Sequence, residues 1–504
     1  MALAVCLFWK GVALGEGRIN QEGRILGALP VVTNAILFDT NNADAVVSAM
    51  QIFPVTNPWN ENVSRLPVLT NSGAMIAQII SDLATNRRSL ITEFEMNFVL
   101  VPDNQPLVPI YFFNYPDQSD LNGGTYPEGS YPIPANLPIE EWPNSTTNSL
   151  LQWQTNNDGS DRHAIMVQPG AGYTFETWET QLTPTNWIAS NGAEFNLNTN
   201  GLRPAGWTSG DAAGLPMFSA IVRYDEAERG MVEHACRIVV KRSLYNNYIY
   251  PATHFASAST NTNVNLPSMG QRLRLKSAFV IPASFTKEEN ALLLGLKKYG
   301  ALVADNGNFF SISVTPDDRW PANCFNDLTS ISITNFEVVQ STGPTGGPRS
   351  PGAPTANAGA NQFIPPGSAA QLQGVVSYTG ALPAIQWQLY SGPGAVTFGN
   401  ASQTNTTANF STNGVYTLML SADDGVHAVA YDAVIITVGQ SISLALAANG
   451  TNVNLSWSGG APPYVLQEAF ALSPTVWSNV LTTSNQNATL AATNVTGFFR
   501  VVGN

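Results

Sequence analysis

The chain has 504 residues, more than one hydrophobic core usually holds, so we expect several domains. A hydrophobic fraction of 44% excludes wholesale disorder, and charged residues contribute only 11%. The formal net charge of −13, with no basic stripe, excludes a nucleic-acid partner. Asn, Thr, Ser and Gly take the place of charged residues, and this composition is typical of extracellular β proteins.

The first residues form a short apolar run, Met1 to Trp9, followed by a small-residue site at Ala13-Leu14-Gly15. This pattern is typical of a secretory signal, so we expect a leader remnant in residues 1–24 and a secreted or cell-surface protein. The run is too short to span a bilayer and no later segment qualifies, so no membrane span is expected. Cys6 lies in this leader, which leaves Cys236 and Cys324 as one disulfide or two free thiols.

Residues 25–341 predict one mainly β domain, sandwich-like or barrel-like, with a few helices. Apolar residues at helical spacing predict a helix within 72–85, and a second over Ser284–Tyr299 with Ser284 as its N-cap and Gly300 at its end. We expect a long ordered loop at 114–160 and a tight turn at Asp305-Asn306-Gly307. The predicted strands are 94–101, 108–113, 164–167, 173–178, 193–196, 220–224, 233–240, 272–281, 301–304 and 309–314.

A Gly- and Pro-rich linker is expected at 342–352, followed by two small β-sandwich modules at 353–439 and 440–504. Residues 351–504 contain only five charged side chains, too few to carry much catalysis. Trp387, Gly414-Val-Tyr416 and Ala422-Asp-Asp-Gly425 make the first module resemble a PKD-like, immunoglobulin-type sandwich, which implies a spacer or a carbohydrate contact. The second module, with Val453-Asn-Leu-Ser-Trp457, is similar to a short fibronectin type III domain.

Residues 161–257 hold three of the four histidines and a concentration of charged and aromatic side chains. Most of 50–340 resembles a family of secreted bacterial proteins without an assigned function, through Leu202-Arg-Pro-Ala-Gly-Trp-Thr208, Val222-Arg-Tyr-Asp-Glu226 and Lys297-Lys-Tyr-Gly300. The resemblance implies a shared fold and supplies no mechanism. The reaction therefore has to be argued from the residues.

The favoured hypothesis is hydrolysis of an extracellular polysaccharide or cell-surface glycan by paired carboxylates, one protonated and one ionised. Glu176 and Trp178 project to the same side of a predicted strand, which would place an acid beside an aromatic ring. The candidate acids are Asp161, Glu176, Glu179, Asp211 and Asp225. The residues expected to act in catalysis are Asp161, Glu176, His163, His254 and Asp211, and those expected to bind substrate are Trp178, Arg203, Trp207 and Arg237.

Two alternatives remain open from the sequence. In the first, His163, His234 and His254 bind a divalent or transition metal, which is expected only if they converge and is the only cofactor considered. A related option is a lyase, with a histidine base and Arg203 or Arg237 neutralising a uronate carboxylate. In the second, the domain is a non-catalytic carbohydrate-binding or adhesive module. No Gly-x-Ser-x-Gly elbow and no Gly-rich phosphate loop is present, which disfavours a nucleophilic triad and a nucleotide cofactor.

Overall fold

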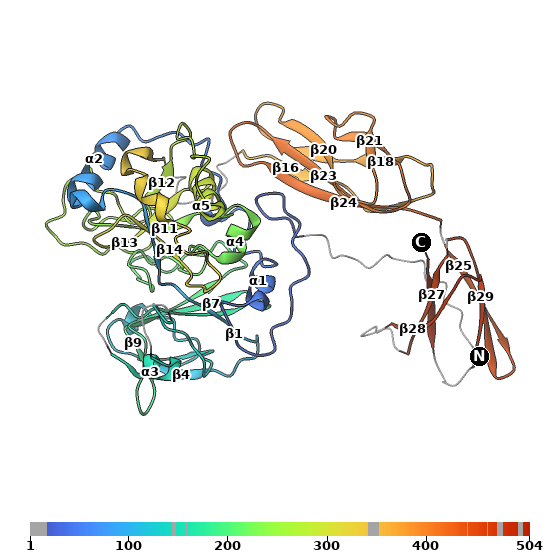
Figure 1. Cartoon of the computed structure of the whole chain (residues 1–504), viewed down its shortest axis with the longest axis horizontal. Coiled ribbons are helices and arrows are strands. Elements are labelled where there is room, and N and C mark those ends of the chain that lie inside the picture. The colour runs from blue at the N-terminus through green and yellow to red at the C-terminus, as the bar shows by residue number, and fades with distance from the viewer. Residues whose placement is uncertain are drawn as a thin grey trace. The chain divides into compact units, whose positions relative to one another are not determined.

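The structure is a computed structural model, and it describes residues 18–143, 148–157, 160–340, 352–440, 442–460, 462–470, 477–491 and 497–503. The chain divides into a larger compact unit, residues 18–353 with 425–428, and a smaller unit drawn from residues 354–424 and 429–504 (Figure 1). The expected linker, Gly352 apart, and residues 1–17 of the expected leader lie outside the described ranges. Residues 18–24 belong to the larger unit, where Arg24 forms an ion pair with Glu233. In the described parts of the chain, no helix is long and apolar enough to cross a membrane.

Three sheets build the larger unit, which confirms the mainly β fold class. The five-stranded sheet has the order β1-β3-β6-β7-β10, with strands Ile36–Leu37, Val99–Leu100, Ala164–Gln168, Tyr173–Trp178 and Asn191–Asn196. The four-stranded sheet has the order β5-β4-β9-β8, with strands Glu128–Tyr131, Val108–Phe112, Trp187–Ala189 and Gln181–Leu182. The six-stranded sheet has the order β15-β12-β13-β11-β14-β2, with strands Phe336–Val338, Arg272–Leu275, Ala301–Asn306, Cys236–Val240, Ser311–Val314 and Ile91–Phe94.

The five-stranded sheet is buried on both faces, as β6 shows. Ala164 and Met166 belong to a core shared with the four-stranded sheet, whereas Ile165 and Val167 belong to the larger core shared with the six-stranded sheet. Neighbouring residues of a strand point to opposite faces, so a strand buried on both sides reads as a continuous apolar run. In Figure 1 this sheet, seen at β7, lies between the four-stranded sheet below and the six-stranded sheet above.

The helices of the larger unit are short and cover the edges of these sheets. Helix α2 packs against β15, and α5 packs against β12 and α4. Their bounds are Asn41–Val47 for α1, Ser72–Asp82 for α2, Leu150–Thr155 for α3, Tyr224–Arg229 for α4 and Lys287–Lys298 for α5. The 3-10 turns are Pro58–Asn60, Thr85–Arg87, Pro116–Gln118, Asn326–Ser330 and Ile333–Asn335.

Several expected boundaries are wrong. Thr286, not Ser284, caps α5, because its side chain accepts from the Glu289 backbone N–H while the Glu289 carboxylate accepts from the Thr286 N–H. The strand expected at 220–224 is reduced to an isolated bridge between Val222 and Val314, and helix α4 begins at Tyr224. The strand expected at 94–101 is interrupted between β2 and β3, and the turn expected at 305–307 begins only after β13 ends at Asn306.

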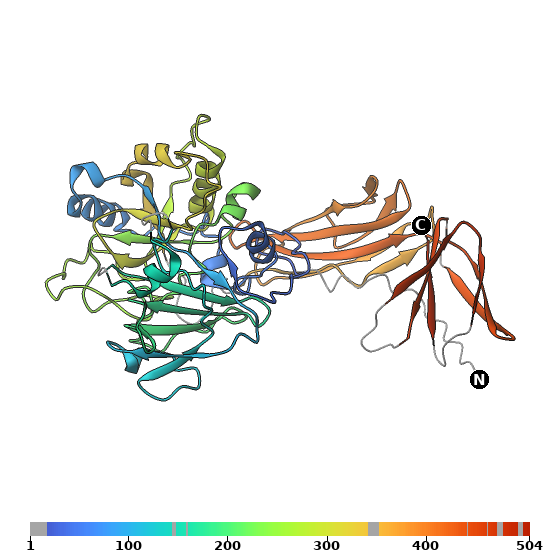
Figure 2. The ribbon, with the colours of Figure 1, turned by 60° about the horizontal axis from the view of Figure 1, so that its bottom comes forward.

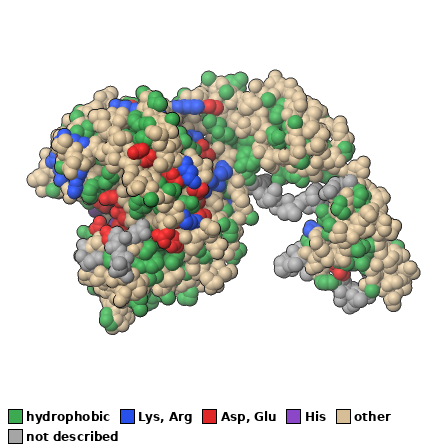
Figure 3. Space-filling model, viewed as in Figure 1, with side chains coloured by type: hydrophobic (Ala, Val, Ile, Leu, Met, Phe, Trp, Pro, Cys, Tyr) green, Lys and Arg blue, Asp and Glu red, His purple; other side chains and the backbone are tan. Residues whose placement is uncertain are grey.

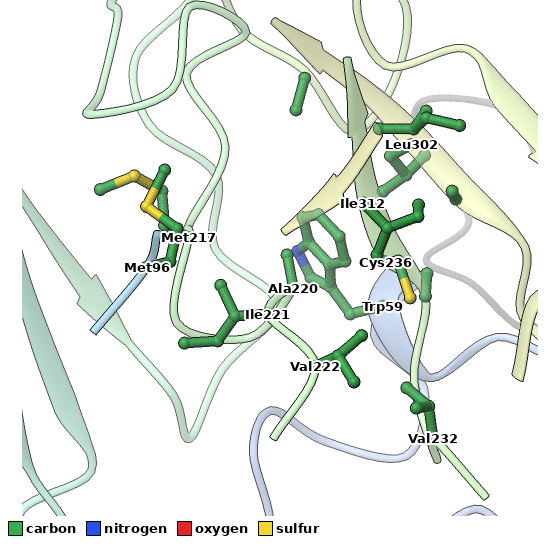
Figure 4. Close-up of a cluster of buried hydrophobic side chains, with 14 of the residues drawn as sticks. Trp59, Met96, Met217, Ala220, Ile221, Val222, Val232, Cys236, Leu302 and Ile312 are labelled. Atoms are coloured by element: carbon green, nitrogen blue, oxygen red, sulfur yellow. The ribbon is translucent and has the colours of Figure 1, made fainter. Parts of the chain in front are cut away.

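Trp59, which is 2% exposed, lies in the large core (Figure 4). It lies among Cys236 of β11, Ile312 of β14 and the loop residue Ala220. Trp59 is far from these residues in the sequence, yet it packs in the core beside the six-stranded sheet. Cys236 and Cys324 are both free and buried, so the disulfide considered from the sequence is not formed. Burial raises the pKa of the Cys236 thiol far above its usual value, so this thiol stays protonated and inert.

The smaller unit contains two sandwiches, each with its own core. In the first, the sheets β17-β24-β23-β20 and β18-β22-β21, with a β16-β19 ribbon, pack around Trp387 and Tyr416. Its strands are Thr355–Asn357, Gln362–Ile364, Ala370–Gln373, Val375–Ser377, Ala384–Ser391, Val396–Phe398, Asn405–Phe410, Gly414–Asp423 and Ala430–Val438.

In the second sandwich, the sheets β25-β26-β29 and β28-β27-β30 pack around Trp457 and Tyr464. Its strands are Ser443–Asn449, Asn452–Ser458, Tyr464–Ala469, Ser478–Thr483, Asn487–Ala491 and Phe498–Val502.

Candidate functional site

The candidate site is a group of charged side chains around Arg237, which lies on β11 in the middle of the six-stranded sheet. Because β13, β11 and β14 are adjacent, Asp305 and Ser313 lie next to Arg237, and Glu95 follows directly after the neighbouring strand β2. We call the seven side chains gathered here the Arg237 network: Glu95, Glu140, His163, Asp211, Arg237, Asp305 and Ser313.

Arg237 is held by Asp211 in a bidentate ion pair. Its Nε lies 3.0 Å and 3.2 Å from the two carboxylate oxygens of Asp211, and its Nη2 also contacts Oδ1. Nη1 donates to the Ser313 hydroxyl at 2.6 Å. The two charged side chains are 3% and 0% exposed. A buried charge is tolerated only when it is paired and hydrogen-bonded, and this pair satisfies that condition.

Two further carboxyl groups contact the same guanidinium and reach solvent. Glu95 Oε1 lies 3.4 Å from Nη1, and Asp305 Oδ2 lies 3.7 Å from Nη2. Their side chains are 23% and 27% exposed, in contrast to the enclosed Asp211. One guanidinium thus faces three carboxyl groups, and only one of them can be fully neutralised by it.

This surplus of acid is reflected in the ionisation of the two outer carboxyl groups. Burial and then the negative charge of Glu140 raise the pKa of Glu95 to about 8, against the opposing effect of Arg237. Burial and then the charge of Asp211 raise the pKa of Asp305 to about 7. Both groups therefore exchange protons near neutral pH, which is the range required of general acids and bases.

His163 adds a second ion pair to the network. Glu140 Oε2 accepts from both the backbone N–H of His163, at 3.1 Å, and ring Nδ1, at 2.9 Å, while Nε2 lies 2.9 Å from the Gly210 carbonyl oxygen. Burial alone would lower the pKa of His163, but the Glu140 carboxylate outweighs it and raises that pKa to about 10. His163 is thus an imidazolium that donates from both nitrogens.

The backbone around the network adopts conformations that are uncommon for residues with side chains. Glu141, Arg162 and Glu179 have φ values of 69°, 50° and 53°. The Glu141 N–H donates to the Glu95 carbonyl at 3.0 Å, so this turn is attached directly to the segment that carries the Glu95 side chain. Residues held at positive φ cluster at functional sites because the surrounding structure must offset their cost.

The structure brings together three of the residues named from the sequence, His163, Asp211 and Arg237. It encloses Glu176 instead: this carboxylate is 0% exposed and accepts from the backbone N–H groups of Met217 and Phe218 at 2.8 Å and 3.0 Å. Burial raises the pKa of Glu176 to about 7. Since Glu176 faces backbone amides in the core, its contacts are those of a group that anchors the loop after Gly214.

Trp178 is half-buried and faces Asp161, not Glu176. Its indole Nε1 donates to Asp161 Oδ1 at 3.4 Å, and Asp161 is exposed on the surface two residues before His163. The expected pair of Glu176 with an aromatic platform is therefore replaced by Asp161 with Trp178. Alternation placed Glu176 and Trp178 on one side of β7, but the end of the strand leaves the core between them.

The three histidines do not share a pocket. His234 lies between the Ala235 carbonyl oxygen at 2.7 Å and the Glu226 carboxylate at 3.1 Å, so acceptors occupy both ring nitrogens, as in His163. A metal needs a ring nitrogen whose lone pair faces it. In the ranges that the structure describes, no group of three or more His, Cys, Asp or Glu side chains is arranged to hold a metal ion. The convergence on which the metal hypothesis depended is therefore absent from this part of the chain.

His254 is the one of these histidines with a ring nitrogen that has no hydrogen-bond partner among the described residues. Its Nδ1 donates to the Ala212 carbonyl oxygen at 2.8 Å, since that oxygen can only accept. Ala212 follows Asp211, which places His254 beside the network and outside it.

Arg203 and Trp207 lie together but apart from the network. The guanidinium lies 5.5 Å from the Trp207 ring centroid, contacts the Asp120 carboxylate and donates to the Thr208 carbonyl at 2.8 Å. Arg203 and Arg237 are thus each bound to a carboxylate and buried, so neither presents a free guanidinium to a uronate. Asp225 is likewise committed, to ion pairs with Arg223 and Arg229.

Four members of the network, Glu95, Glu140, Asp305 and Ser313, were missed from the sequence. Glu140 lies in the expected loop, and Asp305 was interpreted as a turn residue. One signal was available for Asp305, which follows the apolar run Ala301 to Ala304 near the end of β13, and side chains at strand ends often line sites in sheets. Glu95 follows the mixed segment Ile91-Thr-Glu-Phe94, which carries no such signal.

Comparison with known proteins identifies one module. Residues 358–438 match a family model for a PKD domain, which confirms the PKD-like sandwich expected at 353–439. PKD domains are typical of extracellular proteins. No curated protein matches the chain.

Several solved structures are similar to parts of the chain. The PKD domain from the KIAA 1837 protein is 22% identical and covers 20% of this chain and 93% of its own, with a TM-score of 0.15. The PKD domain of human KIAA0319 is 22% identical, and the match covers 20% of this chain and 91% of that domain, with a TM-score of 0.16. A nucleoside hydrolase-related protein from Saccharophagus degradans, associated with carbohydrate metabolism, is 18% identical. The match covers 26% of this chain and 35% of that protein, with a TM-score of 0.16. No statement about function follows from these likenesses.

Proposed function

We propose that the larger unit hydrolyses an extracellular polysaccharide, with Glu95 and Asp305 as its acid and base. One observation carries this proposal: two solvent-reaching carboxyl groups with raised pKa values contact opposite nitrogens of one buried guanidinium. The PKD module supports an extracellular setting for such an activity. Asp211 and Arg237 then serve as positioning residues that hold the two outer carboxyl groups.

The separation of the two carboxyl groups suits this chemistry. Because both contact the same guanidinium, their contacting oxygens are at most about 9.5 Å apart, a bound that includes both the roughly 5–5.5 Å of retaining and the roughly 6.5–9.5 Å of inverting glycosidases. In the inverting arrangement that we propose, a water molecule attacks the anomeric carbon from the face opposite the leaving group.

We assign the two roles from the pKa values of the two carboxyl groups. Glu95 has the higher pKa, about 8, so it is the protonated acid that donates to the glycosidic oxygen as the bond from that oxygen to the anomeric carbon breaks. Asp305, with a pKa of about 7, is the carboxylate that takes a proton from water as the water oxygen bonds to the anomeric carbon. One water is consumed, and proton exchange with solvent restores both groups.

The experiment is to incubate the purified protein with neutral, uronate-containing and amino-sugar polysaccharides and to measure new reducing ends. We expect product from at least one of them, and a fall in rate of about 10²–10⁴ in Glu95→Gln and Asp305→Asn. Asp318→Asn is the matched control, since Asp318 is an exposed carboxylate outside the network. Circular dichroism checks that each variant is folded.

Two outcomes overturn the proposal. The first is no product from any polysaccharide with folded protein, and retardation of that protein in polysaccharide gels would then assign non-catalytic binding. The second is full activity in both network variants, which would place the acid and base elsewhere.

A further inference from the structure

The outer face of the four-stranded sheet carries uncovered aromatic rings. Tyr111 of β4 and Phe113, which follows β4, are 39% and 43% exposed, while the intervening Phe112 and the preceding Ile110 are buried at 0% and 1%. This alternation is that of a strand with one face in the core and one in solvent. Adjacent exposed rings often mark a binding surface, whereas single exposed hydrophobic residues are common.

Two more rings lie near the end of β4. Tyr115 and Trp178 have ring centroids 6.2 Å apart with an interplanar angle of 31°, and both are half-buried. The main chain connects them to the sheet face, because Ser190 accepts from the Tyr115 N–H at 2.9 Å and donates to the Trp178 carbonyl at 2.7 Å. We call Tyr111, Phe113, Tyr115 and Trp178 the ring platform.

The platform leads towards the Arg237 network. The Trp178 indole donates to the Asp161 carboxylate, and Asp161 lies two residues before His163, whose protonated ring it helps to stabilise. The teal strands of this sheet are seen at the lower edge of the larger unit in Figure 2.

The charges of this region select among polymers. The sequence has no Lys or Arg between Arg88 and Arg162, and none between Arg162 and Arg203, while both Arg162 and Arg203 are buried. The charged groups beside the rings are carboxylates, Glu128 on β5 and Asp161. Figure 3 shows no Lys or Arg side chain over the lower part of the larger unit on the face displayed. Such a surface repels a polyanion and offers ring faces to the C–H faces of sugars.

We infer that the ring platform binds an uncharged polysaccharide chain, and that the substrate of the acid pair is a neutral polysaccharide. The second half of this inference rests on the proposed function, whereas binding by the rings does not. The platform supplies affinity away from the reacting bond, and the network supplies the chemistry.

Affinity electrophoresis of the full chain tests the inference, with galactomannan, xyloglucan and mixed-linkage β-glucan as neutral probes, alginate as a polyanion and chitosan as a polycation. We expect retardation by at least one neutral probe and none by alginate, whereas chitosan should retard the acidic chain by charge alone, whether or not the rings are present. The double variant Tyr111→Ala/Phe113→Ala and the single variant Trp178→Ala should each weaken that retardation at least fivefold. Phe363→Ala, which removes an exposed ring from the PKD module, is the matched control and should leave it unchanged.

The outcomes separate this inference from the hydrolase proposal. Glu95→Gln should bind the neutral probe as well as the unaltered protein does. Ring-dependent retardation without new reducing ends would leave the platform standing and overturn the hydrolase. Retardation by the neutral probe that survives both ring variants, absence of retardation by all neutral probes, or ring-dependent binding of alginate would each overturn the platform as a site for uncharged polysaccharide.

Discussion

Arg237 and Asp211 form an ion pair whose side chains are 3% and 0% exposed, in the interior of a sheet-rich domain with few charges. Replacing such a pair by apolar residues is often neutral, whereas removing one partner leaves an uncompensated buried charge. The pair therefore holds the Arg237 guanidinium in place, and the outer carboxyl groups contact this guanidinium.

Removal of the guanidinium should destabilise the larger unit strongly. We expect Arg237→Met to lower the free energy of unfolding by about 3–5 kcal/mol, because Asp211 would remain buried without a counter-charge. Urea unfolding measures this change. Arg242→Met is the control, since Arg242 is 40% exposed in its pair with Asp82 and should cost less than about 1 kcal/mol. Equal costs for both variants would contradict the assigned role.

The pH dependence of kcat/KM should be bell-shaped with its maximum between about pH 7 and 8. Below about 7 Asp305 takes up a proton and stops acting as a base, and above about 8 Glu95 loses the proton it must donate. Residual activity of Glu95→Gln should lack the alkaline limb, and that of Asp305→Asn the acid limb. Rate measurements from pH 5 to 10 test this, and Asp318→Asn should keep both limbs. A flat profile would remove these carboxyl groups from the mechanism.

Stability should fall at alkaline pH through His163. Its folded pKa, about 10, lies above the unfolded value of 6.5, so its contribution is fully present below pH 6.5 and lost as the pH rises through 10. For Glu140 the folded pKa is lowered, so its contribution is present above the unfolded value of 4.5 and lost as the pH falls. Urea midpoints at pH 6 and pH 9.5 should differ in the unaltered protein and in His254→Gln, and differ much less in Glu140→Gln. An undiminished difference in Glu140→Gln would refute the ion pair.

The cap of helix α5 offers a test of local structure. Thr286→Ala should cost about 0.5–2 kcal/mol of stability, because the Glu289 backbone N–H loses its acceptor. Ser284→Ala should leave the stability almost unchanged, since Ser284 is exposed and lies two residues before the capping residue Thr286. Chemical unfolding of the two variants side by side is sufficient, and a larger loss in Ser284→Ala would contradict the observed boundary.

Local pattern was sufficient for much of the architecture. Period-two strands and the compositional change near residue 350 predicted a β-rich domain followed by two sandwiches, and the apolar spacing at Met75, Ile76 and Ile79 predicted α2. The boundaries at Thr286 and Tyr224 were not predicted well, because Ser and Thr are both good caps and because a short apolar run suits either a strand or the start of a helix.

The sequence by itself determined the class of the protein: a mainly β, modular chain with few charges, a PKD-like module and a charged segment within residues 161–257. Only the tertiary structure decided which charges meet. Glu95, Arg237 and Asp305 are far apart along the chain and become neighbours through the strand order of one sheet, while Asp211 reaches Arg237 from the loop between β10 and α4. Strand order depends on long-range pairing that no local pattern encodes. Tertiary packing likewise buried Glu176, on β7 of the five-stranded sheet, while it left Glu95 and Asp305 in reach of solvent.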